Sequence, residues 1–373
     1  MVEISKIQTG PNEMILNLGP QHPSTHGVCR LVLRTDGEKV LNIDPVIGYL
    51  HRGIEKLAEN RTYIQFLPLT DRLDYVAAMG NNMPYAMAIE ELMEVEVPER
   101  GEYIRVIMLE LQRLASHLLF IGTFGADLGA WTVLMYGFRE RERILDLLEM
   151  VSGGRLLYSY IYPGGVRYDL PEGFVEKCRK TLKELPKYFE DYNDYFYSNE
   201  IFLKRCEGVG VLKAEDAINL GITGPILRAC GAPNDLRKDD PYSIYDQLDF
   251  KVITEKEGDT LARFNVRMGE IYESINIINQ ALDSLPEGDF RAKVPKVLKP
   301  PPGAVYTRTE APRGELSIYL LSDGESKNPY RLKIRSPSFC NLSAFPFFAE
   351  GDILANVVAN FAGIDIVLGD VDR

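Results

Sequence analysis

Residues 17–27 read NLGPQHPSTHG and hold two of the four histidines of this 373-residue chain, His22 and His26. The residues before and after this stretch, at 14–18 and 28–33, predict a strand on each side of it. Two prolines restrict the backbone of the connecting loop, so the loop can hold an imidazole at a fixed point, as a proton donor requires. On these residues alone, the commoner alternative stays open that each histidine only satisfies backbone groups of a turn.

Small antiparallel sheets are expected near both ends of the chain. Alternation of apolar and polar residues over 12–46, with a turn at Thr35–Glu38 and an end at Pro45, predicts the first sheet. A second small sheet is expected from strands at 305–308, 315–321 and 331–334.

Between the two sheets, apolar residues recur at helical spacing. The expected helices cover 54–67 (broken at Pro68), 72–93, 101–123, 131–151, 172–192, 214–220, 260–285 and 349–362. Consecutive helices of this length are typical of a bundle, so the predicted fold class is α+β, mainly α, with a central helical bundle. We expect three parts: an N-terminal β region with the histidine loop (1–46), a helical core (47–300), and a C-terminal β/α region with a buried tail (301–373).

The composition is that of a soluble globular protein, with 45% apolar and 26% charged residues. The net charge of −12 and the lack of a long Lys/Arg run make nucleic acid an unsuitable partner. The apolar runs are too short to span a bilayer, and no secretion signal is seen, so we expect the chain in the cytoplasm, free or docked. The five cysteines form no CxxC pair, which argues against a self-contained metal or cluster site. Any redox centre that this protein works with is therefore expected in another chain.

Several charged residues interrupt the predicted helices. Glu110, Arg113 and His117 share one side of a helix, where they can pair with each other or with a neighbour. The alternating run 139–143 is expected to be a solvated or partner-facing flank. Asp127, within the glycine-containing break at 125–129, has a purely structural alternative as a cap of the next helix. Taken alone, these residues indicate a helical protein that is part of an assembly.

A set of short motifs gives a more specific indication. In order they are GPQHPSTHG (19–27), GYLHRGIEK (48–56), RTY (61–63), DRLDY (71–75), RERE (139–142), PGGV (163–166), LRACG (227–231), PY (241–242) and GDVDR (369–373). Over nearly the whole chain they resemble the large catalytic-arm subunit of respiratory complex I, the 49 kDa subunit, called the D subunit in bacteria.

That resemblance implies a fold like the large subunit of nickel–iron hydrogenases, to which the family is related. Those enzymes hold their metal with two CxxC pairs. The corresponding positions here fall around Asp74 and Tyr75, and around Val367 and Asp370, and none is cysteine. Because carboxylates replace thiolates poorly as ligands of soft metals, no nickel is expected, and the old metal cavity should bind a quinone head group.

The resemblance also implies which residues handle the quinone. His26 and Tyr75 would donate hydrogen bonds and protons to its two carbonyls. Asp127 would hydrogen-bond to His26, fix its tautomer and raise its pKa.

Further binding residues follow from the same resemblance. His22 would support the site from the same loop, and Arg52 and Arg72 would face the iron–sulfur cluster or the acceptor pocket. A cation near a cluster stabilises its reduced form. Asp365 and Asp370 would belong to the binding site from the C-terminal tail.

The implied function is that of one part of a membrane-associated, ion-pumping dehydrogenase (a translocase), inactive alone. No cofactor is expected on this chain. Electrons would come from a [4Fe–4S] cluster in an adjacent small subunit of the B type, and subunits of the C type and of the membrane-arm H type would be further partners. The chain would lie on the cytoplasmic side of the membrane, peripherally, and the electron donor to the complex stays open between NADH, a reduced deazaflavin and ferredoxin.

Two departures from the family pattern favour a variant. Leu157 stands where many relatives have a histidine, and a segment of about 25 residues is missing before the strand at 305. An archaeal deazaflavin-dependent (F-420) dehydrogenase, with methanophenazine as the acceptor, would fit both. The alternative of a different class is a membrane-bound hydrogenase-related or purely structural subunit. A hydrogenase needs paired cysteines, and a scaffold does not need His26 and Tyr75 together.

Overall fold

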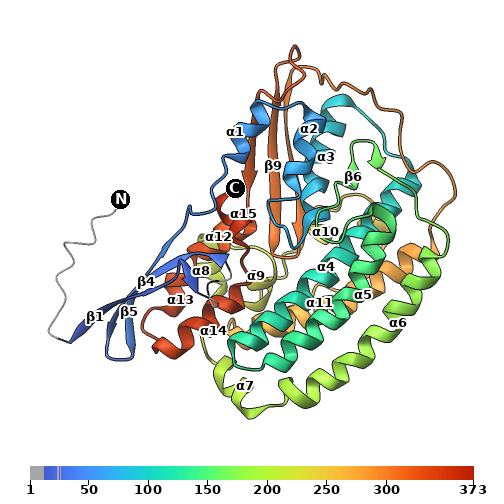
Figure 1. Cartoon of the computed structure of the whole chain (residues 1–373). Coiled ribbons are helices and arrows are strands. Elements are labelled where there is room, and N and C mark those ends of the chain that lie inside the picture. The colour runs from blue at the N-terminus through green and yellow to red at the C-terminus, as the bar shows by residue number, and fades with distance from the viewer. Residues whose placement is uncertain (1–11, 23–24, 26) are drawn as a thin grey trace.

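The computed structural model describes residues 12–22, 25 and 27–373. It has a helical body, a three-stranded sheet packed along one side of that body, and a second three-stranded sheet that projects from it (Figure 1). The predicted class, α+β and mainly α, is confirmed. No helix in the described part of the chain is long and apolar enough to cross a membrane.

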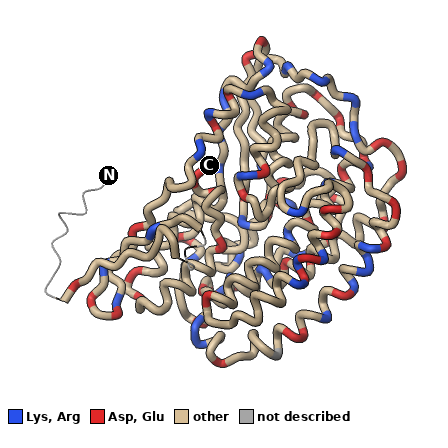
Figure 2. Tube along the Cα trace, in the orientation of Figure 1, with Lys and Arg blue, Asp and Glu red and all other residues tan. Residues whose placement is uncertain are grey.

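The helical body is built around one long central helix, α4, which contacts both α5 and α11 (Figure 1). Its interior is a single apolar cluster to which the longest helices contribute. Acidic and basic residues alternate along α6 at the outer edge of the body (Figure 2). The main helices are α3 (Ala78–Met93), α4 (Glu99–Asp127), α5 (Trp131–Ser152), α6 (Phe174–Tyr192) and α11 (Thr260–Asp283).

The N-terminal sheet has the strand order β1-β4-β5 and is antiparallel throughout. The short antiparallel pair β2 and β3 comes between β1 and β4 in the sequence, and His22 pairs with Gly27 in it. The sheet packs on helices from the other end of the chain, with Leu31 and Ile43 in one apolar cluster with Phe345. These strands are β1 (Glu13–Leu18), β2 (Gln21–His22), β3 (Gly27–Val28), β4 (Arg30–Asp36) and β5 (Lys39–Val46).

The C-terminal sheet has the order β10-β9-β8 and packs against α1, α2 and α3. Its strands are β8 (Gly303–Ala311), β9 (Gly314–Ser322) and β10 (Arg331–Arg335). Ala311 pairs with Gly314, so only two residues, one of them Arg313, form the turn between the longest strands. Gly314 has a φ of +131°, and a Cβ there would meet Thr223, so this turn is pressed against the chain at residue 223.

Short elements complete the chain. They are α1 (Ile54–Glu59), α2 (Tyr63–Thr70), β6 (Ile161–Tyr162), β7 (Gly165–Val166), η3 (Asn193–Tyr197), α7 (Glu200–Cys206), α8 (Ala214–Asn219), α9 (Pro225–Ala229), α10 (Leu236–Asp239), η4 (Tyr245–Gln247), α12 (Pro337–Ser343), α13 (Phe345–Ala349), α14 (Leu354–Ile364) and α15 (Leu368–Asp372).

Helix boundaries account for most of the errors in the sequence prediction. The helix expected at 54–67 is two helices, because Thr62 begins α2 with a capping box, and α2 runs through Pro68 to Thr70. The helix expected at 349–362 begins only at Leu354, as α14, because α13 ends at Ala349 and residues 350–353 are not helical. The helix expected from Arg72 begins only at Ala78, since residues 71–77 form turns.

The break expected at 125–129 was also wrong in part. Helix α4 continues through Gly125 and ends at Asp127. A Cβ at Gly125 would come within 2.8 Å of Val133, so this glycine lets α5 turn back closely against α4. The flank expected at 139–143 is only half solvated, because Glu140 and Arg141 are buried.

Candidate functional site

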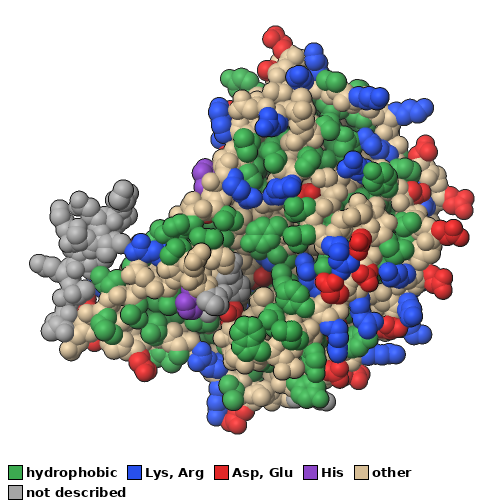
Figure 3. Space-filling model, in the orientation of Figure 1, with side chains coloured by type: hydrophobic (Ala, Val, Ile, Leu, Met, Phe, Trp, Pro, Cys, Tyr) green, Lys and Arg blue, Asp and Glu red, His purple; other side chains and the backbone are tan. Residues whose placement is uncertain are grey.

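A cavity of about 440 Å³ lies where the turns before α3, the end of α4, the start of α5, the β8–β9 turn and the C-terminal tail meet. Its wall is mainly apolar, with a few polar groups. Exposed apolar side chains (Trp131, Met135 and Phe138) lie on the first turns of α5, and Trp131 also lines the cavity. Figure 3 shows hydrophobic side chains gathered at several places on one face of the molecule. The residues that line the cavity are Tyr75, Val76, Leu119, Thr123, Ala126, Asp127, Trp131, Leu134, Arg313, Asp365, Ile366 and Val367.

Three of the residues predicted for the site line this cavity together. Tyr75 comes from the turn before α3, Asp127 is the last residue of α4, and Asp365 follows α14. They are separated by up to 290 positions in the sequence, so the fold alone brings them to one place.

Tyr75 is placed by the tight turn that precedes α3. The Asp74 carboxylate accepts a hydrogen bond from the Val76 backbone N–H at 3.0 Å, and the Asp74 carbonyl accepts one from Ala77 at 3.0 Å. Burial raises the pKa of Tyr75, and the Asp74 carboxylate adds to this shift, while Arg313 and Arg52 oppose it. The phenol therefore stays protonated at neutral pH and can donate a hydrogen bond into the cavity.

Asp127 does not cap the following helix. The N-cap position of α5 is Ala130, and no side chain caps it. The structural alternative for Asp127 is therefore wrong, and its half-buried side chain forms part of the cavity wall instead.

Of the two histidines predicted for the site, His22 is exposed on β2. Between them, Thr25 is buried, and its hydroxyl donates to the His22 carbonyl at 2.8 Å and to the Gly27 carbonyl at 3.1 Å. His26 lies outside the described residues, and its role stays a prediction.

Arg52 and Arg72 are exposed, and neither is among the residues that line the cavity. Arg52 donates to the Gly369 carbonyl at 2.9 Å, and Arg72 donates to the Pro68 carbonyl at 2.7 Å. Partial burial lowers the pKa of Arg52, and the positive charge of the neighbouring Arg72 lowers it further. The two cations thus form a positive site on the surface near Tyr75.

The C-terminal tail is buried and packs against the turn that carries Tyr75. A Cβ at Gly369 would meet the Leu73 carbonyl at 2.8 Å and the Tyr75 ring at 3.0 Å. Asp370 is buried, and its carboxylate accepts a hydrogen bond from the Ser338 N–H at 3.1 Å. The Asp372 carboxylate accepts from the Gly48 and Leu50 N–H groups at 2.8 and 2.7 Å, which fixes the end of this segment.

Arg313 is the main residue that the sequence analysis missed. It is buried, lines the cavity, and its Nη1 lies 2.6 Å from Asp74 Oδ2 and 3.2 Å from Ser116 Oγ. Its Nη2 lies 3.1 Å from Asp365 Oδ1, and its Nε donates to the Asp365 carbonyl at 2.7 Å. An arginine between Pro312 and Gly314 has the pattern of an exposed turn, and only its tertiary position reveals its role.

Asp74, the partner of Arg313, has a markedly raised pKa. Burial raises its pKa to about 6, against the opposing effect of Arg313, and the nearby Asp370 and Asp365 carboxylates add to the rise. A carboxyl group with a pKa in this range exchanges protons near neutral pH.

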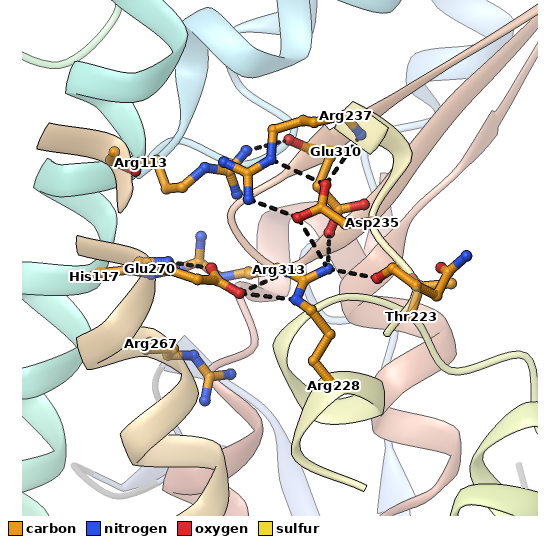
Figure 4. Close-up of polar contacts among 12 residues, drawn as sticks. Arg113, His117, Thr223, Arg228, Asp235, Arg237, Arg267, Glu270, Glu310 and Arg313 are labelled. Carbon is orange, nitrogen blue, oxygen red and sulfur yellow. Dashed lines mark hydrogen bonds and ion pairs between the residues drawn. The ribbon is translucent and has the colours of Figure 1, made fainter. Parts of the chain in front are cut away.

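Behind the cavity, a network of buried charges runs along α4 and α11 (Figure 4). His117 Nε2 lies 2.8 Å from Glu270, and Glu270 also pairs with Arg228 at 2.8 Å. Arg113 pairs with Glu110 at 3.2 Å. The predicted stripe of Glu110, Arg113 and His117 is therefore buried, and its members form ion pairs or hydrogen bonds with each other and with neighbours, as expected.

The positions that correspond to the hydrogenase metal ligands offer no sulfur donors. Asp74 is ion-paired with Arg313, and Val367 is apolar. Within residues 12–22, 25 and 27–373, no group of three or more His, Cys, Asp or Glu side chains is arranged to hold a metal ion.

Comparison with known proteins identifies the class. The family described as "Respiratory-chain NADH dehydrogenase, 49 Kd subunit" matches residues 127–301 and 292–373. The D subunit of NADH-quinone oxidoreductase from Clostridium beijerinckii is 51% identical over 361 residues, which is 97% of each chain. The protein of the same name from Dehalococcoides mccartyi is 54% identical over 360 residues, 96% of this chain and 98% of the relative. The D 2 subunit of the Sinorhizobium medicae enzyme is 48% identical over 387 residues, 97% of this chain and 96% of the relative.

A mainly helical α+β subunit of an oxidoreductase complex is thus the class that the fold and the relatives define. The chain belongs to the family of the 49 kDa subunit of the respiratory-chain NADH dehydrogenase, complex I. Members of this family are parts of a multi-subunit complex.

Proposed function

We propose that this chain forms the quinone reduction site of a complex I-type, ion-pumping dehydrogenase. The observation that carries the proposal is that Tyr75, Asp127 and Asp365, which are far apart in the sequence, line one cavity. An apolar cavity with a few convergent polar groups is the usual form of a site for a small aromatic ligand.

The chemistry of the site follows from the reaction. Reduction of a quinone takes up two electrons and two protons, so donors must lie at both carbonyl oxygens. Tyr75 is protonated and half-buried in the wall, and it would serve one carbonyl. His26, oriented by Asp127, would serve the other. His22 would support the loop from outside the cavity, and Asp370 would act through the electrostatic field around Asp74 and Arg313.

The electrons would enter from a partner. We place the cluster-bearing small subunit on the face with Arg52 and Arg72, because cations there stabilise the extra negative charge of a reduced cluster. The exposed apolar residues at the start of α5 would be covered in the same assembly, next to the membrane arm, on the cytoplasmic side.

Quinone is favoured over methanophenazine, and NADH over a deazaflavin, as the partners of the complex. The relatives that match this chain at nearly equal length are named as D subunits of NADH-quinone oxidoreductase. The alignment with the Sinorhizobium medicae protein is longer than the part of this chain that it covers, so that relative carries residues without counterparts here. Length therefore varies among proteins with the same name, and the missing segment is no argument for another donor or acceptor.

The purely structural alternative makes an opposite prediction about Tyr75. Among the described residues, none hydrogen-bonds to the Tyr75 hydroxyl, so removal of this group should cost little stability. A scaffold would tolerate the change Tyr75→Phe, whereas a quinone site would lose a donor.

The test is electron transfer from NADH to a soluble short-chain quinone by the purified complex that contains Tyr75→Phe. We expect a loss of at least about tenfold in turnover, in the range for removal of one positioned proton donor. Tyr197→Phe is the matched control, because Tyr197, in η3, is also half-buried and its hydroxyl contacts Met268, away from the cavity. Full activity of the Tyr75 variant would refute the proposal.

A further inference from the structure

Two buried arginines from different parts of the fold bind residues 363–365, where the segment that lines the cavity (365–367) begins. Arg313, from the β8–β9 turn, bonds to Asp365 Oδ1 and to the Asp365 carbonyl. Arg267, from α11, donates to the carbonyls of Gly363 and Ile364 at 3.2 and 3.1 Å. Its Nε lies 3.6 Å from Asp365 Oδ2. The two oxygens of one carboxylate therefore face two different guanidinium groups.

The backbone at Asp365 needs such support. Asp365 has a φ of +59°, in the left-handed region that non-glycine residues seldom adopt, and it ends α14. From this bend the chain continues as Ile366 and Val367 along the cavity. The course of residues 366 and 367 along the cavity therefore depends on the contacts that hold Asp365 in this conformation.

We propose that Arg267 is a positioning residue of the acceptor site, which fixes the tail wall of the cavity and balances the second carboxylate oxygen of Asp365. Arg267 is fully buried and is not among the residues that line the cavity, so it would act through Asp365 and the tail. This inference rests on the proposed function, because it assumes that the acceptor binds in this cavity.

The charges around Asp365 give the inference an electrostatic consequence. The charged groups that face it are Arg313 from the β8–β9 turn, Arg267 from α11, Asp74 from the turn before α3 and Asp370 from α15. On its other side, Arg267 faces Glu270, His117 and Arg228. Without Arg267, three carboxylates near the cavity would share one guanidinium. An acceptor that takes up an electron becomes more negative, so this loss would disfavour its reduction.

Arg263 provides a matched control one helical turn earlier on α11. Both arginines are fully buried, and each lies over an aromatic ring at 4.2 Å, Phe348 for Arg263 and Phe120 for Arg267. Arg263 also donates to backbone carbonyls, those of Gly210 and Gly258. None of these contacts is with residues 363–367, so its removal should cost stability without a specific effect on the acceptor.

The experiment compares Arg267→Gln, Arg267→Lys and Arg263→Gln in the assembled complex. The readouts are KM and kcat for a soluble short-chain quinone as functions of pH, with the thermal midpoint of the complex. Arg267→Gln should raise KM several-fold above the value for Arg263→Gln. It should also make kcat fall more steeply toward high pH, because carboxylates that have lost a cation oppose the negative charge of the reduced acceptor only while they are ionised. Arg267→Lys should restore the pH profile but leave KM raised, since Lys keeps the charge and loses the fork that binds two carbonyls.

Equal KM values and equal pH profiles for Arg267→Gln and Arg263→Gln would overturn the inference. Should the glutamine variants fail to assemble, Arg267→Lys and Arg263→Lys decide the question on KM alone. Tyr75→Phe is measured alongside. Full activity of that variant would refute the proposed function, whereas its loss of activity with indistinguishable arginine variants would refute only the role of Arg267.

Discussion

The Arg313 guanidinium lies 2.6 Å from the Asp74 carboxylate and ties the β8–β9 turn to the turn that presents Tyr75. The two residues are 239 positions apart, and both are buried. A buried pair of this kind holds two walls of the cavity in register, and its ionisation state is coupled to the pH near neutrality.

Asp74 should make stability pH-dependent. Its pKa rises from 3.8 in the unfolded chain to about 6 in the folded one, mainly through burial. The folded state therefore binds a proton that the unfolded state has released, so this contribution is complete below pH 3.8 and is lost as the pH rises through 6. Asp74→Asn, which carries no titrating group, should gain stability relative to the parent between pH 4 and pH 7, by at most about 3 kcal/mol. Thermal midpoints of the complex across this range check the prediction, and parallel curves would contradict it.

His117 should act in the opposite direction. Burial lowers its pKa, although Glu270 opposes the shift. The unfolded chain therefore takes up a proton near pH 6.5 that the folded chain does not, and stability is lost as the pH falls through this value. His117→Gln, which keeps an N–H donor for Glu270, should become more stable relative to the parent as the pH falls from 7 to 5. The same midpoint measurements report it, and a difference that does not vary with pH would argue against a neutral His117.

Glu270 should be a costly carboxylate to remove. It pairs with Arg228 and His117 in the interior, and Glu270→Ala leaves an arginine with one fewer counter-charge. Such a loss costs about 3–5 kcal/mol, enough to lower the yield of assembled complex. Glu200→Ala, which breaks the exposed pair with Lys204, should change stability by about 0.5 kcal/mol or less. Similar yields for the two variants would show that the buried network contributes little.

Gly369→Ala should impair quinone reduction through contact with Tyr75. The added methyl group would lie 2.8 Å from the Leu73 carbonyl and 3.0 Å from the Tyr75 ring, so the tyrosine or the tail must move. We expect lower turnover with the complex still assembled. Gly80→Ala is the control, because a Cβ there meets nothing within 4 Å in α3 and should be neutral or slightly stabilising. Unchanged kinetics in the Gly369 variant would mean that Tyr75 need not be held in place.

The sequence allowed the fold class to be predicted because the long helices α4, α5, α6 and α11 have clear helical periodicity. Boundaries were wrong where a local signal competed with tertiary packing. Pro68 suggested a break that α2 does not make, and Gly125 suggested a loop where it instead allows close contact between α4 and α5. The three-part division of the chain stays a prediction.

The candidate site could be predicted only through the resemblance to a known family. Tyr75, in the motif DRLDY, and Asp127 and Asp365 were found in this way, and they line one cavity. Arg313 and Arg267 were not, because their importance comes from contacts with distant carboxylates. A charged residue in a turn or on a helix carries no sign in the sequence that it will be buried.

The contact between the C-terminal segment 365–372 and residues 48–50 has a consequence for the order in which the protein folds during synthesis. Residues 365–367 form part of the cavity wall, and Asp372 is bound by the backbone of Gly48 and Leu50. A ribosome releases the early segments of a chain well before residues 365–372 emerge. The cavity therefore cannot form before residues 365–367 have been synthesised, and a chain truncated before them would lack this wall.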